Sequence, residues 1–182
     1  MVEIADFVAH APVPAEVIEE YRERVPEALV EVWERYGYGS FAGGFLRTID
    51  PKLYEAEVGD CIGRVSGSSV NIPVMVTGMG DLVTWETDQF VAIQYWRQQV
   101  TGLGSRLSGV IRRAGSGMLL EHMGEEIFTE AVAAHGELAY DQSFIFVPLI
   151  SLGGEAKVEN LHKRETIASI QVAVEFQGVI DH

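Results

Sequence analysis

Two adjacent glycines, Gly153 and Gly154, follow an apolar run and precede a lysine, which is the outline of a phosphate-binding loop. A loop of the Walker type needs a lysine followed by Ser or Thr, because these side chains hold the phosphates and the magnesium ion. The segment LGGEAKVEN has Lys157 but no hydroxyl after it, and Glu155 would repel a phosphate. A dinucleotide-binding fingerprint fails because a third glycine at the required spacing is missing. The pair therefore predicts a tight turn before a helix.

Histidine, cysteine and serine residues do not form a recognisable catalytic or metal-binding set. None of the five histidines has a second His at i+4 or a Cys at ligand spacing, and His122 has only nearby glutamates. The single cysteine, Cys61, follows Asp60, which would raise rather than lower the pKa of the thiol. The segment SGSS at residues 66–69 is not a Gly-x-Ser-x-Gly elbow. We therefore expect no enzyme, no metal ion and no cofactor.

Carboxylates are the charged groups in excess, with 27 Asp and Glu against 13 Lys and Arg and a formal charge of −14. This charge argues against direct binding to nucleic acid or to an anionic membrane, and it favours a basic protein partner. Several acids flank the predicted sheet, and a tryptophan on one of its strands could anchor an interface. The predicted partner-binding patch comprises Glu55, Glu57, Asp60, Asp81, Trp85, Glu86 and Asp88.

The sequence also predicts a cytoplasmic protein. No run approaches the roughly 18 apolar residues of a membrane span, and MVEIADFVAH carries acids where a signal peptide would carry Lys or Arg. One cysteine cannot form an internal disulfide.

The elements that must position these residues are predicted as helices, then a sheet, then helices. Apolar residues at helical spacing indicate two helices with an acidic outer face, and Asp50-Pro51 predicts a short third helix. Short β-branched and aromatic runs indicate antiparallel strands. The predicted elements are helices at 14–25 and 26–36, a strand at 45–49, a helix from 50, strands at 72–78, 81–86 and 90–96, and helices at 119–135 and 157–177.

The predicted fold class is α+β, with N-terminal helices, a small central antiparallel sheet and C-terminal helices. Glycine-rich segments at 37–44 and 101–109 are interpreted as connectors. The last helix is expected to start near Lys157 and to pack through Leu161, Ile167 and Ile170. We predict two domains, 1–105 and 106–182, packed together as one compact unit.

The C-terminal string LAYDQSFIFVPLISLGGEAKVENLHKRETIASIQVAVEFQG, residues 138–178, resembles the C-terminal domain of the GAD-like immunity proteins of bacterial type VI secretion. The positions that carry the resemblance are Tyr140, Asp141, Phe146, Pro148, Leu152, Gly153, Gly154, Val158, Asn160 and Leu161. The segment VPEALVEVWERYGYGSFAGGFLRTIDPKLYEAEV, residues 25–58, is similar to the GAD-like domain itself. Together with Gly80-Asp81 and Trp85 in the predicted sheet, the resemblance spans nearly the whole chain.

The resemblance implies a non-enzymatic antidote that binds and neutralises a cognate toxin, usually a DNase, and it provides no catalytic residues. A basic nuclease effector is a partner that suits an acidic protein. The alternative is a small-molecule-binding regulator with a groove between the helical and sheet parts, in which Arg47, Arg64 and Arg106 would contact an anion. The sequence leaves the identity of the toxin and the oligomeric state open.

Overall fold

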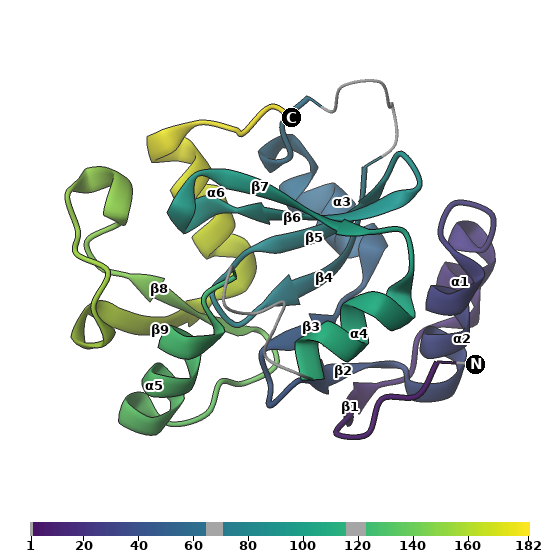
Figure 1. Cartoon of the computed structure of the whole chain (residues 1–182). Helices are drawn as coiled ribbons and strands as arrows, with labels where there is room; N and C mark the ends of the chain where they lie inside the picture. The colour runs from purple at the N-terminus through teal and green to yellow at the C-terminus, as the bar shows by residue number, and fades with distance from the viewer. Residues whose placement is uncertain (1, 65–70, 116–122) are drawn as a thin grey trace.

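The computed structural model describes residues 2–64, 71–115 and 123–182 of the chain. At its centre is a seven-stranded antiparallel sheet whose strands pair in chain order, and a separate two-stranded hairpin lies beside it (Figure 1). The sheet consists of β1 (Val8–Ala11), β2 (Tyr38–Phe41), β3 (Leu46–Thr48), β4 (Ile72–Thr77), β5 (Leu82–Glu86), β6 (Gln89–Gln94) and β7 (Gln99–Gly104). The hairpin consists of β8 (Gln142–Phe146) and β9 (Leu161–Glu165).

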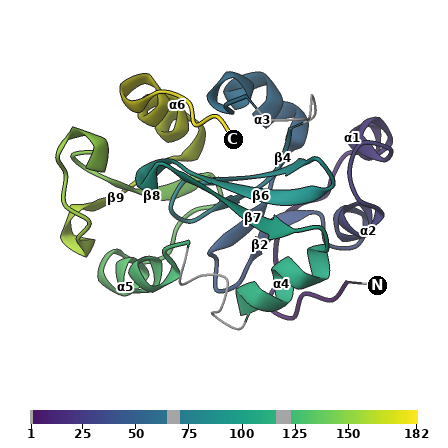
Figure 2. The same cartoon turned by 45° about the horizontal axis from the view of Figure 1, so that its top comes forward.

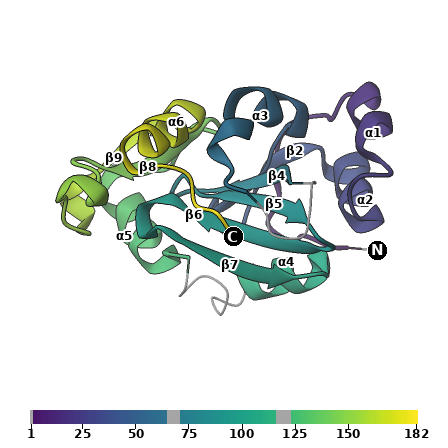
Figure 3. The ribbon, with the colours of Figure 1, turned by 90° about the horizontal axis from the view of Figure 1, so that it is seen from above.

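Helices cover both faces of the sheet, as Figures 2 and 3 show: α3 and α6 lie on one face, and α4 lies on the other with α2 beside it. The helices of the described residues are α1 (Ala15–Tyr21), α2 (Glu27–Tyr36), α3 (Pro51–Val58), α4 (Leu107–Gly115), α5 (Glu125–His135) and α6 (Thr166–Gln177). The predicted α+β class is confirmed.

Two hydrophobic cores occupy the two faces because successive strand residues point to opposite sides. On β5, Val83 belongs to the larger core with Trp33 of α2 and Phe128 of α5. Its neighbour Leu82 belongs to the smaller core, which lies beneath α3 and α6 and includes Ile170. The predicted strands at 72–78, 81–86 and 90–96 are confirmed as β4, β5 and β6.

Capping residues place two of the helices. The carboxylate of Asp50 accepts hydrogen bonds from the main-chain N–H groups of Lys52 (2.9 Å) and Leu53 (3.4 Å). Because Pro51 lacks an N–H and has a helical φ, the Asp-Pro pair starts α3 as predicted. At α6 the cap is Glu165, whose carboxylate accepts from Ile167 N (3.1 Å) and Ala168 N (2.6 Å).

The expectation that the last helix starts near Lys157 is wrong. Residues Leu161–Glu165 form strand β9, which pairs with β8 from Phe146↔Leu161 to Gln142↔Glu165. The helix begins only after the cap, at Thr166. Burial of Phe144 and Phe146 explains the difference, because the hairpin presses these rings into the larger core and needs a partner strand to do so.

The interpretation of the two glycine-rich segments as connectors is wrong in part, because each contains strand residues. Gly39 lies in β2, where an added Cβ would come within 2.4 Å of the carbonyl oxygen of Val8 on β1, so glycine permits this close strand approach. The second segment contains most of β7. The residues predicted around Leu119 and His122, and the loop at Ser66–Ser69, lie outside the described residues.

The turn predicted at the double glycine is confirmed. Gly153 follows the short 3-10 turn Ile150–Leu152 with a φ of 88°. A side chain at Gly154 would meet the carbonyl oxygen of Pro148 at 2.1 Å. The segment that resembles a phosphate loop is therefore a structural turn between β8 and β9.

Candidate functional site

Two residues of the predicted acidic patch are buried inside the protein. Asp81 is 0% exposed and Glu86 is 1% exposed, so neither carboxylate is on the surface, and the prediction that both contribute to a surface patch is wrong. Glu86 accepts a hydrogen bond from the Thr84 hydroxyl and lies 2.9 Å from Nε2 of His182. These contacts give Glu86 a structural role, because they hold the last residue of the chain against β5.

Asp81 is also held by structural contacts. It accepts hydrogen bonds from the main-chain N–H of Tyr95 (3.1 Å) and from the Thr77 hydroxyl (3.4 Å). Burial raises the pKa of the Asp81 carboxyl well above its ordinary value, and the bonds from Tyr95 and Thr77 oppose this rise. The carboxyl therefore closes the turn between β4 and β5 and joins it to the end of β6.

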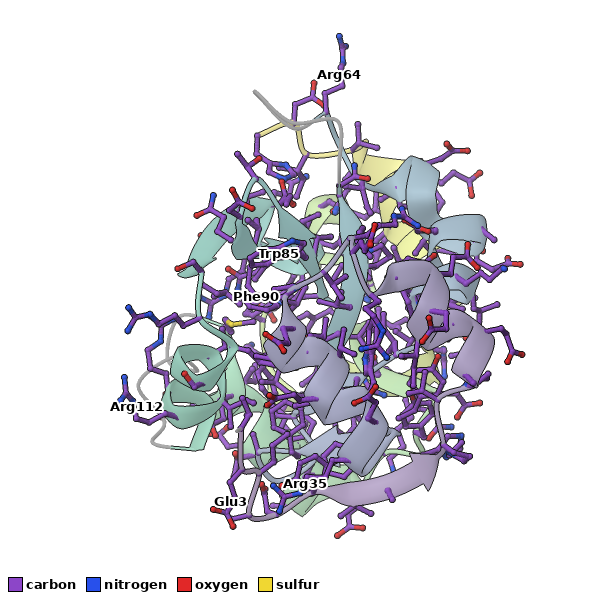
Figure 4. The ribbon with its side chains drawn as sticks, turned by 90° about the vertical axis from the view of Figure 1, so that its right-hand side faces the viewer. Glu3, Arg35, Arg64, Trp85, Phe90 and Arg112 are labelled. Carbon is purple, nitrogen blue, oxygen red and sulfur yellow. The ribbon has the colours of Figure 1, made fainter. Side chains whose placement is uncertain are left out.

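The other predicted residues lie in two separate places. Glu55, Glu57 and Asp60 are on α3 and the turn that follows it, above the smaller core. Trp85 is half-buried on the opposite face of the sheet, where its ring centroid is 4.8 Å from that of Phe90 (Figure 4), and Asp88 is exposed in the turn after β5. The structure therefore does not bring these residues together as one patch.

Ion pairs join α3 to the N-terminal helices. Arg24 Nη2 lies 3.0 Å from the carboxylate of Glu55, and Lys52 Nζ lies 2.7 Å from that of Glu20. The hydroxyl of Tyr21 also donates to Glu55. Burial, followed by the hydrogen bond to Glu55, raises the pKa of Tyr21. Because these contacts place α1 beside α3, the acids of both helices share one side of the molecule.

We call this side the acidic helical surface. Residues 14–61 contain eleven Asp and Glu against five Lys and Arg, a net charge of −6 (5 − 11), and one of the five bases, Arg47, is buried. The surface is defined by exposed carboxylates from α1, α2, α3 and the turns beside them: Glu16, Glu23, Glu27, Glu57 and Asp60. The sequence indicated the acidic outer face of the first helices, but not that α3 lies next to them.

Arg47 has a structural role that sequence reasoning missed. It lies on β3 at 1% exposure and donates to the main-chain oxygens of Thr77 (2.7 Å), Tyr140 (2.8 Å) and Gln142, and to the Ser143 hydroxyl (2.8 Å). Burial lowers the pKa of the guanidinium to about 10, so the group stays charged at neutral pH.

The three arginines suggested as anion contacts do not form a common site. The guanidinium of Arg47 is used by the protein's own oxygen atoms, whereas Arg64 projects from the molecule (Figure 4) and lies 3.8 Å from Asp181. Arg106 is exposed ahead of α4. These three arginines therefore do not support the small-molecule alternative.

Within the ranges that the structure describes, no three His, Cys, Asp or Glu side chains are placed to hold a metal ion. Cys61 is buried, and burial and then Asp60 raise the pKa of its thiol. No helix of the same ranges is long and apolar enough to cross a bilayer.

Comparisons with known proteins agree with this architecture. The GAD-like domain family matches residues 1–97, and the family of the C-terminal domain of the type VI secretion immunity protein Tdi1 matches residues 114–169. No curated protein matches the sequence. The crystal structure of Atu4351 from Agrobacterium tumefaciens superposes with a TM-score of 0.71 at 19% identity, over 93% of this chain and 85% of that chain, which shows a shared fold. The chain belongs to the GAD-like domain family, and its C-terminal part matches that of a type VI secretion immunity protein.

Proposed function

We propose that this immunity protein binds a cognate type VI secretion toxin directly and neutralises it in the cytoplasm, and that the toxin is a DNase. The family matches support the immunity role. The acidic helical surface is the observation that carries the choice of a nuclease. A DNase must present a basic face to the phosphates of its substrate, and a surface rich in carboxylates can occupy that face in place of DNA.

The proposed inhibition needs no chemical step by the immunity protein. Neutralising a lethal enzyme requires nanomolar or tighter binding, which corresponds to about 12 kcal/mol or more. Interfaces of this strength typically bury on the order of 1,600 Å² in total. We propose that Glu55, Glu57 and Asp60 belong to the interface together with the exposed acids of α1 and α2. We leave Trp85 and Asp88 out of the interface, because Trp85 is half-buried against the larger core and Asp88 lies in the turn after β5, away from α3.

The test uses the toxin encoded beside the gene for this chain. We expect the two proteins to copurify and the immunity protein to prevent degradation of plasmid DNA by the toxin. Reversing three exposed acids of the surface, Glu16→Lys, Glu23→Lys and Glu27→Lys, is expected to slow association and to weaken binding by about 100-fold at low salt. The difference in affinity between this variant and the wild type should become smaller as salt is added.

A matched control reverses three exposed acids elsewhere, Glu126→Lys, Glu130→Lys and Glu159→Lys, and so has the same net charge. We expect the control variant to keep most of its affinity and its protection of DNA. Equal losses in both variants would refute the assignment of the surface. A wild-type protein that does not bind the toxin, or a toxin that does not cleave DNA, would refute the proposed function.

A further inference from the structure

An apolar groove of about 400 Å³ lies between α6 and the loop that joins β8 to β9. Large apolar side chains line it although they are open to solvent: Val147 is 43% exposed, Leu152 54%, Val172 44% and Phe176 58%. Exposed apolar side chains that gather in one place mark interaction surfaces, whereas scattered ones need no explanation.

Helix α6 has two apolar stripes, only one of which is used inside the protein. The inner stripe, which includes Ile170 and Ala173, packs in the smaller core. The outer stripe is Ala168, Val172 and Phe176, which are four residues apart and therefore share one side of the helix. A surface helix normally presents polar residues on its outer side. The outer stripe therefore resembles a helix face that packs against a second helix.

We propose that this groove binds an amphipathic helix of the toxin, an inference that rests on the proposed function and adds a second contact to it. The toxin helix would bury two or three large apolar side chains against Val172 and Phe176. A basic residue beside its apolar stripe would face Glu175, the only charged residue of α6, and an acidic residue would face Arg164 at the groove.

The position of the groove connects it with the acidic helical surface. Helix α6 contacts α3, and Nε2 of Gln171 donates to the main-chain oxygen of Glu57 at 2.8 Å. Both helices lie on the same face of the sheet (Figure 3). One partner that covers α3 can therefore reach both the acidic helical surface and the apolar groove.

Charge favours the toxin over a second copy of this chain as the occupant. Each copy carries a formal charge of −14, so two copies repel one another, whereas a basic toxin is attracted. A standard interface also buries about 800 Å² on each partner, more than a few half-exposed side chains provide. The groove therefore acts as an apolar anchor within a larger interface. Most of its lining, from Ile145 to Ser169, falls within the match to an immunity-protein domain.

The test is the double variant Val172→Ser/Phe176→Ser, with Val8→Ser as the control. Val8 is 67% exposed on β1, outside both surfaces, so its substitution removes exposed apolar area without touching the groove. Circular dichroism and thermal unfolding would first show that all variants are folded. We expect the double variant to bind the wild-type toxin about 100-fold more weakly through faster dissociation, and Val8→Ser to change affinity less than about twofold.

The salt dependence separates this inference from the proposed function. Loss of an apolar anchor should leave the slope of affinity against salt unchanged, whereas charge reversal on the acidic helical surface should flatten it. A double variant that binds the toxin as tightly as the wild type would overturn the groove assignment and leave the proposed function intact. Sedimentation that shows a wild-type dimer dissociated by Val172→Ser/Phe176→Ser would also overturn it, because the occupant would be a second copy.

Discussion

Replacing Arg47 by methionine tests how the two halves of the chain are held together. The side chain lies on β3, but its acceptors at Tyr140, Gln142 and Ser143 are more than ninety residues away in sequence, at the start of β8 or just before it. Arg47→Met keeps an apolar stem of similar length and removes the guanidinium. Residues 140–143 would then lose the three hydrogen bonds that Arg47 donates to them. Three direct bonds remain, from Phe144 N to Gly78 O (2.7 Å), from the Ser143 hydroxyl to Thr77 O (3.3 Å) and from the Tyr140 hydroxyl to Thr48 O.

The size of the effect follows from the acceptors left behind. The main-chain oxygens of Tyr140 and Gln142 would lose the arginine donor, and each unsatisfied buried group costs about 1–3 kcal/mol. The oxygen of Thr77 keeps the Ser143 hydroxyl at 3.3 Å. Removing a desolvated cation offsets part of the loss, because burying a charge is itself unfavourable. We expect a net loss of about 3 kcal/mol, which for a chain of this size lowers Tm by about 6–12 °C.

Urea unfolding of the wild type, Arg47→Met and Arg47→Lys at neutral pH measures this loss. Lysine keeps the charge but lacks the planar fork that serves several acceptors, so Arg47→Lys should lose nearly as much stability. Arg112→Met is the control, because Arg112 is exposed on α4 (Figure 4) and its replacement should stay within about 0.5 kcal/mol. If Arg47→Met is as stable as the wild type, the hydrogen bonds of Arg47 do not hold the two halves of the chain together. If Arg47→Lys is as stable as the wild type, a positive charge is enough at this position and the planar guanidinium is not needed.

Two further substitutions test buried and capping carboxylates. Burial raises the folded-state pKa of Asp81 above its unfolded-state value. The free energy of unfolding of the wild type therefore falls as the pH rises from about 4 through the raised pKa. Over that pH window, Asp81→Asn should become more stable relative to the wild type. Urea unfolding at acid and at neutral pH measures the difference, and a difference that does not change with pH would contradict this. Glu165→Ala removes the cap of α6 and should cost about 1 kcal/mol, seen as a lower Tm by circular dichroism. An unchanged Tm would show that the cap contributes nothing.

Sequence patterns predicted the elements whose own residues show a clear periodicity. Strand β5 alternates between the two cores at Leu82 and Val83, and α2 places Leu29 and Trp33 on one side, so both were recognisable. Strand β9, LHKRE, was missed because only Leu161 is buried and the rest of the strand is polar, which removes the alternation. Strand β2 was missed for a different reason: its glycine, Gly39, has a low strand propensity but permits the close approach of β1.

Prediction of the site failed where burial depends on distant residues. Gly80-Asp81 has the composition of an exposed turn, but Asp81 is buried and accepts a hydrogen bond from Tyr95 N, fourteen positions further along. The predicted patch grouped the acids of α3 with acids near β5 rather than with those of α1, because the contact between α1 and α3 rests on pairs such as Lys52 with Glu20, 32 residues apart. The two-domain division at residue 105 stays a prediction.

The chain-order pairing of the sheet has a consequence for synthesis on the ribosome. All seven strands end by Gly104, so every partner in the sheet is available before β8 has been translated. Strand β3 can therefore pair while three of the four acceptors of Arg47 have not yet been translated. In the nascent chain, water must solvate the guanidinium instead. Docking of the late-emerging residues 140–143 replaces that water, and the groove beside α6 is assembled after the sheet.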